Sequence, residues 1–224
     1  MDDLIKKLSQ AEVFEKFTHR EREELTRLAT RRVLKKGSIL CWQGDPWPHV
    51  LYIESGLLKA VIGSPDGGIY VVSTWEDGVG FWGHTLFDDD GMPSTIEAVE
   101  DTIVYQWQGN EILEFAIRNS DVTLALLRRW TRLIRKRKES IYNLVFSPVA
   151  GRLAKLIIDK FIDEKSPTVQ RDLTLEDMAS MIASSPEVIC RILYQFQDSG
   201  FLHVDRATIT LRDRQGLENL LQQG

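Results

Sequence analysis

A glutamate and an arginine, Glu187 and Arg191, lie four residues apart near the start of an amphipathic segment. At that spacing, two side chains project from the same side of a helix. Arginine can donate two hydrogen bonds to the O6/N7 edge of guanine, and glutamate can accept one from the N4 amine of cytosine. The pair therefore indicates recognition of a G·C-containing step in a DNA major groove. The alternative is an ordinary surface pair, which stabilises a helix by only about 0.2–0.5 kcal/mol.

The apolar residues of the same segment indicate which of its side chains stay exposed. The i, i+3, i+4, i+7 pattern of a helix that packs along one face is followed by Ile189, Ile192, Leu193 and Phe196. The residues at the start of this helix and on its other face are then free to contact DNA. These candidate DNA contacts are Ser185, Pro186, Glu187, Cys190, Arg191 and Tyr194.

Local signals predict another helix directly before this one. Thr174 is suited to cap a helix N-terminus, and Asp177 three residues later completes a capping box. Ser185 can cap the next helix, with Pro186 at its first position, where a missing N–H costs nothing. Two short helices joined by a tight turn are typical of a helix-turn-helix.

A small hairpin is predicted after the two helices, because residues 201–211 alternate in type like the wing that often braces such a pair. Arg206 at its tip is a candidate phosphate contact. Ser147 precedes Pro148 and marks a boundary, since the residue before a proline is disfavoured in a helix. The predicted winged helix-turn-helix domain is therefore 147–224. It holds nine Lys/Arg against eleven Asp/Glu, so weak binding to non-specific DNA is expected.

Upstream of this domain the pattern is different. Residues 1–30 predict one or two amphipathic helices. Short β-like runs separated by glycine turns follow, and they predict a barrel or jelly roll of the kind that commonly encloses a small ligand. The runs are 38–42, 50–53, 57–62, 69–74 and 102–107. With a short helix at 111–119, they form the predicted effector-sensing β-roll domain, 1–120.

A long helix is predicted over residues 122–146, within a dimerisation segment 121–146. Apolar residues recur along it in steps of four and three, the spacing of a coiled-coil seam. The stripe consists of Leu126, Trp130, Leu133, Ile141 and Leu144, with Arg137 at the intervening position. We interpret it as a homodimer seam that also packs on the barrel. Seven basic residues and no acid occupy residues 128–138, a run that is usually solvated surface.

Composition argues against other classes of protein. The 224 residues carry a net charge of -5, are 43% hydrophobic, and contain no apolar run long enough to span a membrane. The N-terminus also lacks a signal-peptide core, so a cytoplasmic protein with no membrane partner is expected. Two cysteines, Cys41 and Cys190, cannot supply an iron–sulfur ligand set. The four histidines are scattered and no nucleophile–base pair stands out, so we expect no enzyme.

Several short motifs in this order resemble the Crp/Fnr family of bacterial transcription regulators. They are Gln43-Gly44-Asp45, Tyr52 to Gly56, Gly83 to Phe87, Val149 to Ala154, and Ser185 to Arg191. The resemblance implies an α+β fold with a β-roll sensor, a long dimerisation helix and a C-terminal winged helix-turn-helix. It also implies a homodimer on a near-palindromic double-stranded operator, with Glu187 and Arg191 reading each half-site, and RNA polymerase as a further partner.

The likeness weakens at the effector site. In the cyclic-AMP branch, a Gly-Glu pair and an Arg-Ser pair bind the nucleotide, and a Thr-Ser pair on the long helix reaches the base. The corresponding pairs here are Gly83-His84, Pro93-Ser94 and Arg137-Lys138. Because the ribose-binding glutamate and the phosphate-binding arginine are both missing, the resemblance implies that the effector is not cyclic AMP.

Two hypotheses for the effector therefore remain, besides a barrel that binds a ligand without any DNA specificity. In the first, a small organic or anionic molecule occupies a pocket with Arg137 or Lys138 as counter-charges. Its predicted lining is Trp82, Gly83, His84, Phe87, Ser94, Arg137 and Lys138, with Phe81 as a further wall. In the second, His84 ligates a haem iron, because the segment from Phe81 to His84 is similar to that of the carbon-monoxide-sensing branch; a histidine without any ligand role is the plain alternative. In either case, effector binding is expected to reorient the DNA-binding domains through the long helix.

Overall fold

The computed structural model describes residues 2–63, 67–88, 90–161, 166–171 and 173–221. Contacts divide the chain into two compact units, one of residues 1–62 and 71–134 and one of residues 63–70 and 135–224. The division falls inside one long helix, whereas the domain boundaries predicted from the sequence, 120/121 and 146/147, fall at its ends. Those boundaries remain a prediction.

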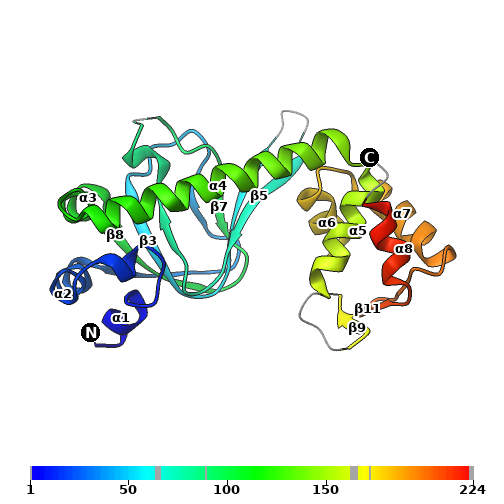
Figure 1. Ribbon diagram of the computed structural model, residues 1–224, viewed down its shortest axis with the longest axis horizontal. Coiled ribbons are helices and arrows are strands. Elements are labelled where there is room, and N and C mark those ends of the chain that lie inside the picture. Colours follow the sequence, from blue (N-terminus) through cyan, green and yellow to red (C-terminus); the bar gives the residue numbers. More distant parts are fainter. Residues whose placement is uncertain (1, 64–66, 89, 162–165, 172, 222–224) are drawn as a thin grey trace. The chain divides into compact units, whose positions relative to one another are not determined.

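The first unit is built around two antiparallel four-stranded sheets (Figure 1). One has the order β1-β8-β3-β6 and the other β2-β7-β4-β5. The strands are β1 (Thr30–Leu34), β2 (Ile39–Cys41), β3 (His49–Ser55), β4 (Leu58–Gly63), β5 (Ile69–Trp75), β6 (Gly80–Trp82), β7 (Thr95–Ala98) and β8 (Thr102–Gln108). The central strand β3 pairs with both β8 and β6.

Strand β3 is buried on both of its faces, because two cores lie on either side of its sheet. Leu51 and Ile53 belong to the core between the strands, whereas Val50 and Tyr52 belong to a second core that the helices cover. Successive side chains of a strand point to opposite faces, so this division follows from the strand itself. A continuous apolar run with no alternation is the sequence signal of such a strand.

Four helical segments complete the second of these cores: α1 (Asp2–Leu8), η1 (Phe14–Lys16), α2 (His19–Leu28) and α3 (Gly109–Arg118). Phe14 packs against Trp107 of β8 with a ring-centroid separation of 5.4 Å. The Trp107 Nε1–H donates a 2.7 Å hydrogen bond to the Leu25 carbonyl of α2, although the tryptophan is only 1% exposed. The N-terminal helices are therefore part of the sensor fold.

The long helix α4 (Ser120–Phe146) leads into the second unit. That unit contains α5 (Val149–Lys160), α6 (Leu175–Met181), α7 (Pro186–Asp198), α8 (Arg214–Leu220) and a small sheet of β9 (Thr168–Gln170), β10 (Leu202–Val204) and β11 (Thr208–Leu211). Its core lies between α5, α6, α7 and the sheet, with Ile189, Ile192, Leu193 and Phe196 among its buried residues.

These elements confirm the predicted α+β class with its barrel, long helix and winged helix-turn-helix. The five β-like runs correspond to β2, β3, β4, β5 and β8, whereas β1, β6, β7 and β9 were not predicted. The wing is a three-stranded sheet of order β10-β11-β9 rather than a two-stranded hairpin. In the part of the chain that the structure describes, no helix is long and apolar enough to cross a membrane.

Candidate nucleic-acid interface and sensor site

The two short helices begin at the caps that the sequence predicts. Thr174 Oγ1 accepts a hydrogen bond from the Asp177 N–H at 3.1 Å, and Asp177 Oδ2 accepts one from the Thr174 N–H at 2.9 Å, which completes the capping box of α6. Ser185 accepts from the Val188 N–H at the start of α7, with Pro186 in the first turn. Both starts are thus fixed by local chemistry.

The turn between α6 and α7 is held by an arginine of α5 that was not singled out for this role from the sequence. Arg152 Nε donates to the Ile182 carbonyl at 2.9 Å, and its Nη2 donates to the Ala183 carbonyl at 3.3 Å. Its Nη1 donates to the Ser147 carbonyl at 2.7 Å. Ala183 itself has a φ of 53°, in the left-handed region that non-glycine residues seldom adopt. The Arg152 side chain therefore links the residue before α5 to the strained turn between α6 and α7.

The outer face of α7 presents the predicted base-reading side chains to solvent. Glu187, Arg191 and Tyr194 are exposed, and Cys190 is half-buried. No ion pair joins Glu187 to Arg191 within the described residues. Hydrogen bonding to Ser185, and then to its own backbone N–H, instead holds the pKa of the Glu187 carboxyl below its ordinary value. The Glu187 carboxylate is therefore charged at neutral pH. Glu187, Arg191, Pro186 and Cys190 line one surface hollow.

The wing places Arg206 beside this face. The Asp205 carboxylate accepts hydrogen bonds from the backbone N–H groups of Ala207 and Thr208 at 2.8 and 2.7 Å, which fixes the turn. Arg206 stands exposed at the tip of that turn, and it lines a second hollow together with Cys190 and Tyr194 of α7. The structure thus brings the predicted DNA contacts to one continuous surface of the second unit.

The sensor candidates gather where the segment after β6 meets α4. The His84 ring lies edge-on to Trp130 with centroids 4.9 Å apart, and Phe87 lies 5.9 Å from the same ring. Gly83 is needed just before them, because a Cβ there would lie 2.5 Å from the Trp47 carbonyl oxygen. The histidine therefore connects to the long helix through an aromatic contact.

One predicted pocket residue, Trp82, is placed differently from the expectation. Trp82 does not face the interior of the barrel; it is 3% exposed in the core under the N-terminal helices, with its ring 6.0 Å from Phe14. The reason is strand alternation, which sends Phe81 to the barrel interior and Trp82 to the other face. Ser94 is buried. Arg137 and Lys138 belong to the second unit, in the later part of α4.

Two aromatic residues that the sequence did not single out, Trp75 and Trp47, lie beside Phe81. Its ring lies 4.7 Å from Trp75, 5.7 Å from Trp47 and 6.1 Å from His84. Rings therefore follow one another from the barrel interior through His84 to Trp130. Haem ligation by His84 remains a prediction. Burial raises the pKa of the Cys41 thiol to about 11, so this cysteine stays protonated.

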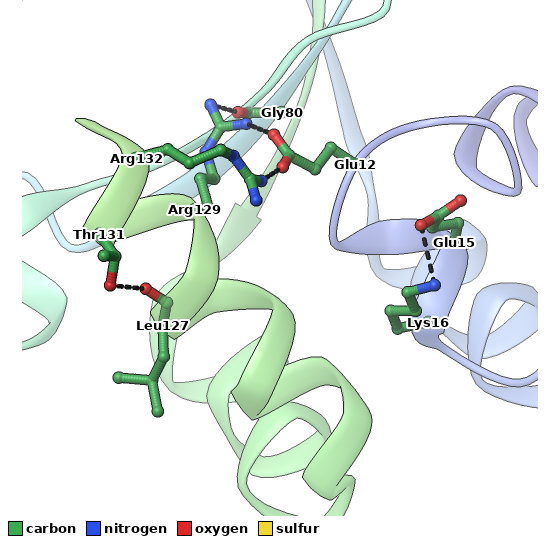
Figure 2. A network of polar contacts seen from close by, with 8 residues as sticks. All are labelled: Glu12, Glu15, Lys16, Gly80, Leu127, Arg129, Thr131 and Arg132. Atoms are coloured by element: carbon green, nitrogen blue, oxygen red, sulfur yellow. Dashed lines mark hydrogen bonds and ion pairs between the residues drawn. The ribbon is translucent and has the colours of Figure 1, made fainter. Parts of the chain in front are cut away.

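The inner face of α4 is fixed to the first unit by a charged network, drawn in Figure 2. Arg129 donates to the Glu12 carboxylate at 2.6 Å and to the Gly80 carbonyl at 2.8 Å, and Arg132 pairs with the other oxygen of Glu12. The Arg129 side chain is only 14% exposed. Because Gly80 begins β6, the network ties the N-terminal segment, the strand before His84 and α4 together.

We expect Glu12→Gln to lower the free energy of unfolding by about 1–2 kcal/mol, because it leaves Arg129 largely buried without a carboxylate partner. Denaturant unfolding followed by circular dichroism measures this change. Glu15→Gln is the matched control, since the pair between Glu15 and Lys16 is exposed and its loss should change stability by less than about 0.5 kcal/mol. Equal effects of the two variants would show that the network is no more than a surface contact.

The outer face of α4 carries a second apolar stripe, which we call the exposed seam. Its members alternate in steps of three and four: Leu124, Leu127, Thr131, Ile134, Lys138, Ile141 and Val145. Leu127, Ile134 and Ile141 are 59%, 67% and 60% exposed. The stripe predicted as the dimer seam shares Ile141 with the exposed seam, and its other members lie about a quarter turn away at 3.6 residues per turn. Leu126 and Trp130 of that stripe pack within the first unit, in agreement with the predicted packing on the barrel, and their part in a homodimer stays a prediction.

Two protein-family models match the chain. A cyclic nucleotide-binding domain matches residues 31–119, and a Crp-like helix-turn-helix domain matches residues 151–220. The CRP-like cAMP-activated global transcriptional regulator of Mycobacterium tuberculosis is 21% identical over 187 residues, which cover 81% of this chain and 84% of the relative. The transcriptional activator protein FnrA of Stutzerimonas stutzeri is 24% identical over 191 residues, covering 83% and 78%.

A solved structure gives the same picture of the fold. A regulator of the Crp/Fnr family from Eubacterium rectale is similar with a TM-score of 0.74 and 20% identity, over 94% of this chain and 97% of that one. All three of these relatives are named as transcription regulators or activators, and none as an enzyme.

Proposed function

We propose that this chain, which belongs to the Crp/Fnr family of transcription regulators, works as a homodimer on a near-palindromic operator under the control of an effector other than cyclic AMP. The family assignment makes it a DNA-binding transcription regulator with an effector-binding domain. Crp/Fnr regulators bind DNA through the helix-turn-helix and act as dimers. The operator, the effector and contact with RNA polymerase are parts of the proposal.

The observation that carries the proposal is the exposed face of α7 beside the wing tip, on which Glu187 and Arg191 form no ion pair with each other among the described residues. Arg191 offers a guanidinium and Glu187 a carboxylate to solvent, within the first two turns of the helix that a helix-turn-helix places in the major groove. Ser185 and Pro186 set the start of that helix. Cys190 and Tyr194 extend the same face, and Arg206 supplies a phosphate contact from the wing.

A second copy of the chain is the occupant we assign to the exposed seam. The apolar members repeat along more than three heptads of α4, which is the pattern of two helices packing along each other. An apolar stripe of this length is unfavourable in water unless it is covered. Two copies joined along this helix would present two α7 helices, as reading of a palindrome requires.

The effector is proposed to act through the contact between His84 and Trp130. Pro93 and Ser94 offer no guanidinium, and His84 offers no carboxylate, at the positions where the cyclic-AMP branch uses them. A molecule bound beside His84, Phe87 and Ser94 would therefore be recognised differently. Any shift of His84 is passed to α4 directly, because the Trp130 ring lies against it.

Selection from a random duplex library by the purified full-length protein, followed by sequencing, tests the proposal. We expect enrichment of near-palindromes whose half-sites lie about 10–10.5 base pairs apart, one turn of the double helix, or a multiple of that spacing. Adding cyclic AMP should change the affinity for the enriched operator less than twofold. Lack of any enriched sequence would refute DNA recognition, and a large response to cyclic AMP would refute the assignment of the effector.

We expect Arg206→Ala to weaken binding to all duplexes alike, because a phosphate contact carries no sequence information. The slope of log K against log salt should fall by about 0.9 for each Arg206 lost, or about 1.8 per dimer. Binding isotherms at several salt concentrations measure the slope. Arg118→Ala removes an arginine of α3 that is also exposed, and it should leave the slope unchanged. A slope in the Arg206 variant equal to that of the unchanged protein would contradict the role assigned to Arg206.

A further inference from the structure

The exposed seam of α4 contains one charged residue. Lys138 lies between Ile134 and Ile141, one helical turn from each, on the same face of the helix. It is exposed, and it forms no ion pair among the residues that the structure describes. In a dimer built on this seam, Lys138 of one copy would meet Lys138 of the other.

Further positive charge surrounds this point. Arg135 lies three residues earlier, at the edge of the seam, and its side chain is also exposed and without an ion pair in the described part of the chain. Residues 122–138 include no aspartate or glutamate, and the first carboxylate after them, Glu139, follows Lys138 directly but lies about 100° round the helix from it, off the seam. The two copies would bring four cations, two lysines and two arginines, to one layer of the interface.

A lysine in a helical seam has a plain structural use, because a single polar residue there fixes the register of the two helices at some cost in stability. That role needs one polar side chain. It does not need flanking arginines, and it leaves the repulsion between the paired cations uncompensated. Guanidinium groups bind phosphate and carboxylate oxygens through paired hydrogen bonds, and an ammonium group adds a point charge.

We propose that a small multivalent oxyanion, carrying phosphate or carboxylate groups, binds between Lys138 and Arg135 of the two copies and stabilises the dimer. The inference rests on the proposed homodimer and adds a chemical class of ligand at its seam. The anion replaces repulsion with attraction in this layer, so dimer formation depends on its concentration. Because α4 continues toward the DNA-binding unit through Ser147, occupancy of this site controls the paired presentation of α7.

Sedimentation equilibrium of the full-length protein tests the inference at constant ionic strength, adjusted with sodium chloride. The arms are chloride alone, sulfate, pyrophosphate and citrate. We expect the dimer dissociation constant to fall at least tenfold in pyrophosphate or citrate relative to chloride, and the arm that responds assigns the class as phosphate or carboxylate. Equal dissociation constants in all four arms would overturn the anion site.

Two variants separate this site from a general effect of salt. In chloride, the dimer dissociation constant of Lys138→Leu should equal that of the unchanged protein in pyrophosphate or citrate. Adding either anion should change the dissociation constant of this variant less than twofold. Lys136→Leu removes the same charge from the opposite side of α4 and should keep the tenfold response. A response that survives in Lys138→Leu overturns the site. A protein that stays monomeric in every arm, with both variants, overturns the proposed homodimer itself, whereas a dimer indifferent to anions overturns only this inference.

Discussion

The Ile134→Lys variant is expected to be monomeric at concentrations where the unchanged protein is dimeric. Ile134 is 67% exposed in the isolated chain and lies at the middle of the exposed seam. Burial of one isoleucine side chain stabilises by about 1.5–3 kcal/mol, so a dimer would lose about 3–6 kcal/mol from its two copies. At 1.4 kcal/mol per tenfold, the dissociation constant should rise roughly 10²- to 10⁴-fold.

Lysine is expected to weaken the dimer more than glutamate at this position. A glutamate at residue 134 could pair with Arg135 or Lys138 across the seam and recover part of the lost stability, whereas a lysine adds to the like charge already there. Sedimentation equilibrium in pyrophosphate measures the change, and circular dichroism checks that the fold is intact. Ile117→Lys is the matched control, because Ile117 is 75% exposed and belongs to α3, outside the exposed seam. If both variants stay dimeric, the seam has been placed on the wrong face.

Helices α6 and α7 of the second unit could be predicted from the sequence because their determinants are local. Thr174 with Asp177, and Ser185 with Pro186, specify where α6 and α7 begin, and both caps are present in the structure. The four apolar residues of α7 then fix which face is buried. The surface that carries the candidate DNA contacts follows from these few residues, with no tertiary information.

Several strands gave no such signal. Four of the five residues of β1 are exposed and only Leu34 is buried. Its sequence therefore shows no alternation of apolar and polar residues. β6 and β9 are three residues long and show little pattern of their own, whereas β2 and β10, which are as short, lie within longer β-like runs. Each exists because a neighbour pairs with it: β1 with β8, β6 with β3, and β9 with β11. Pairing between distant segments cannot be inferred from local residue types.

The two faces of α4 show a different limit on what the sequence can predict, which is the choice of the face that packs inward. Leu126 and Leu127 are adjacent leucines, and nothing in their type says which one packs inward; the structure buries the first and exposes the second. The same holds for Phe81 and Trp82, which face opposite cores. Apolar residues on both sides of an element make the choice of face a question of tertiary structure. Networks such as Glu12 with Arg129 and Arg132, joined across more than a hundred residues, lie equally beyond the sequence.

Arg191→Ala is expected to lower operator affinity by about 1–3 kcal/mol per half-site and to relax the preference at one base pair of each half-site. The cause is the loss of two hydrogen bonds to a guanine edge. Because Arg191 is exposed and forms no ion pair in the described part of the chain, removing it should leave the free energy of unfolding nearly unchanged. Repeating the duplex selection with the variant measures the base preference directly.

Arg191→Lys separates base reading from charge. Lysine keeps the positive charge, and with it the attraction to phosphates, but it cannot present the planar pair of N–H groups that matches the guanine edge. If Arg191 reads a base, the lysine variant should lose base preference nearly as alanine does while keeping the salt dependence of the unchanged protein. If Arg191 only contacts phosphate, lysine should restore binding, and the base preference should survive in both variants. The second pattern would move sequence reading from Arg191 to another residue of the α7 face.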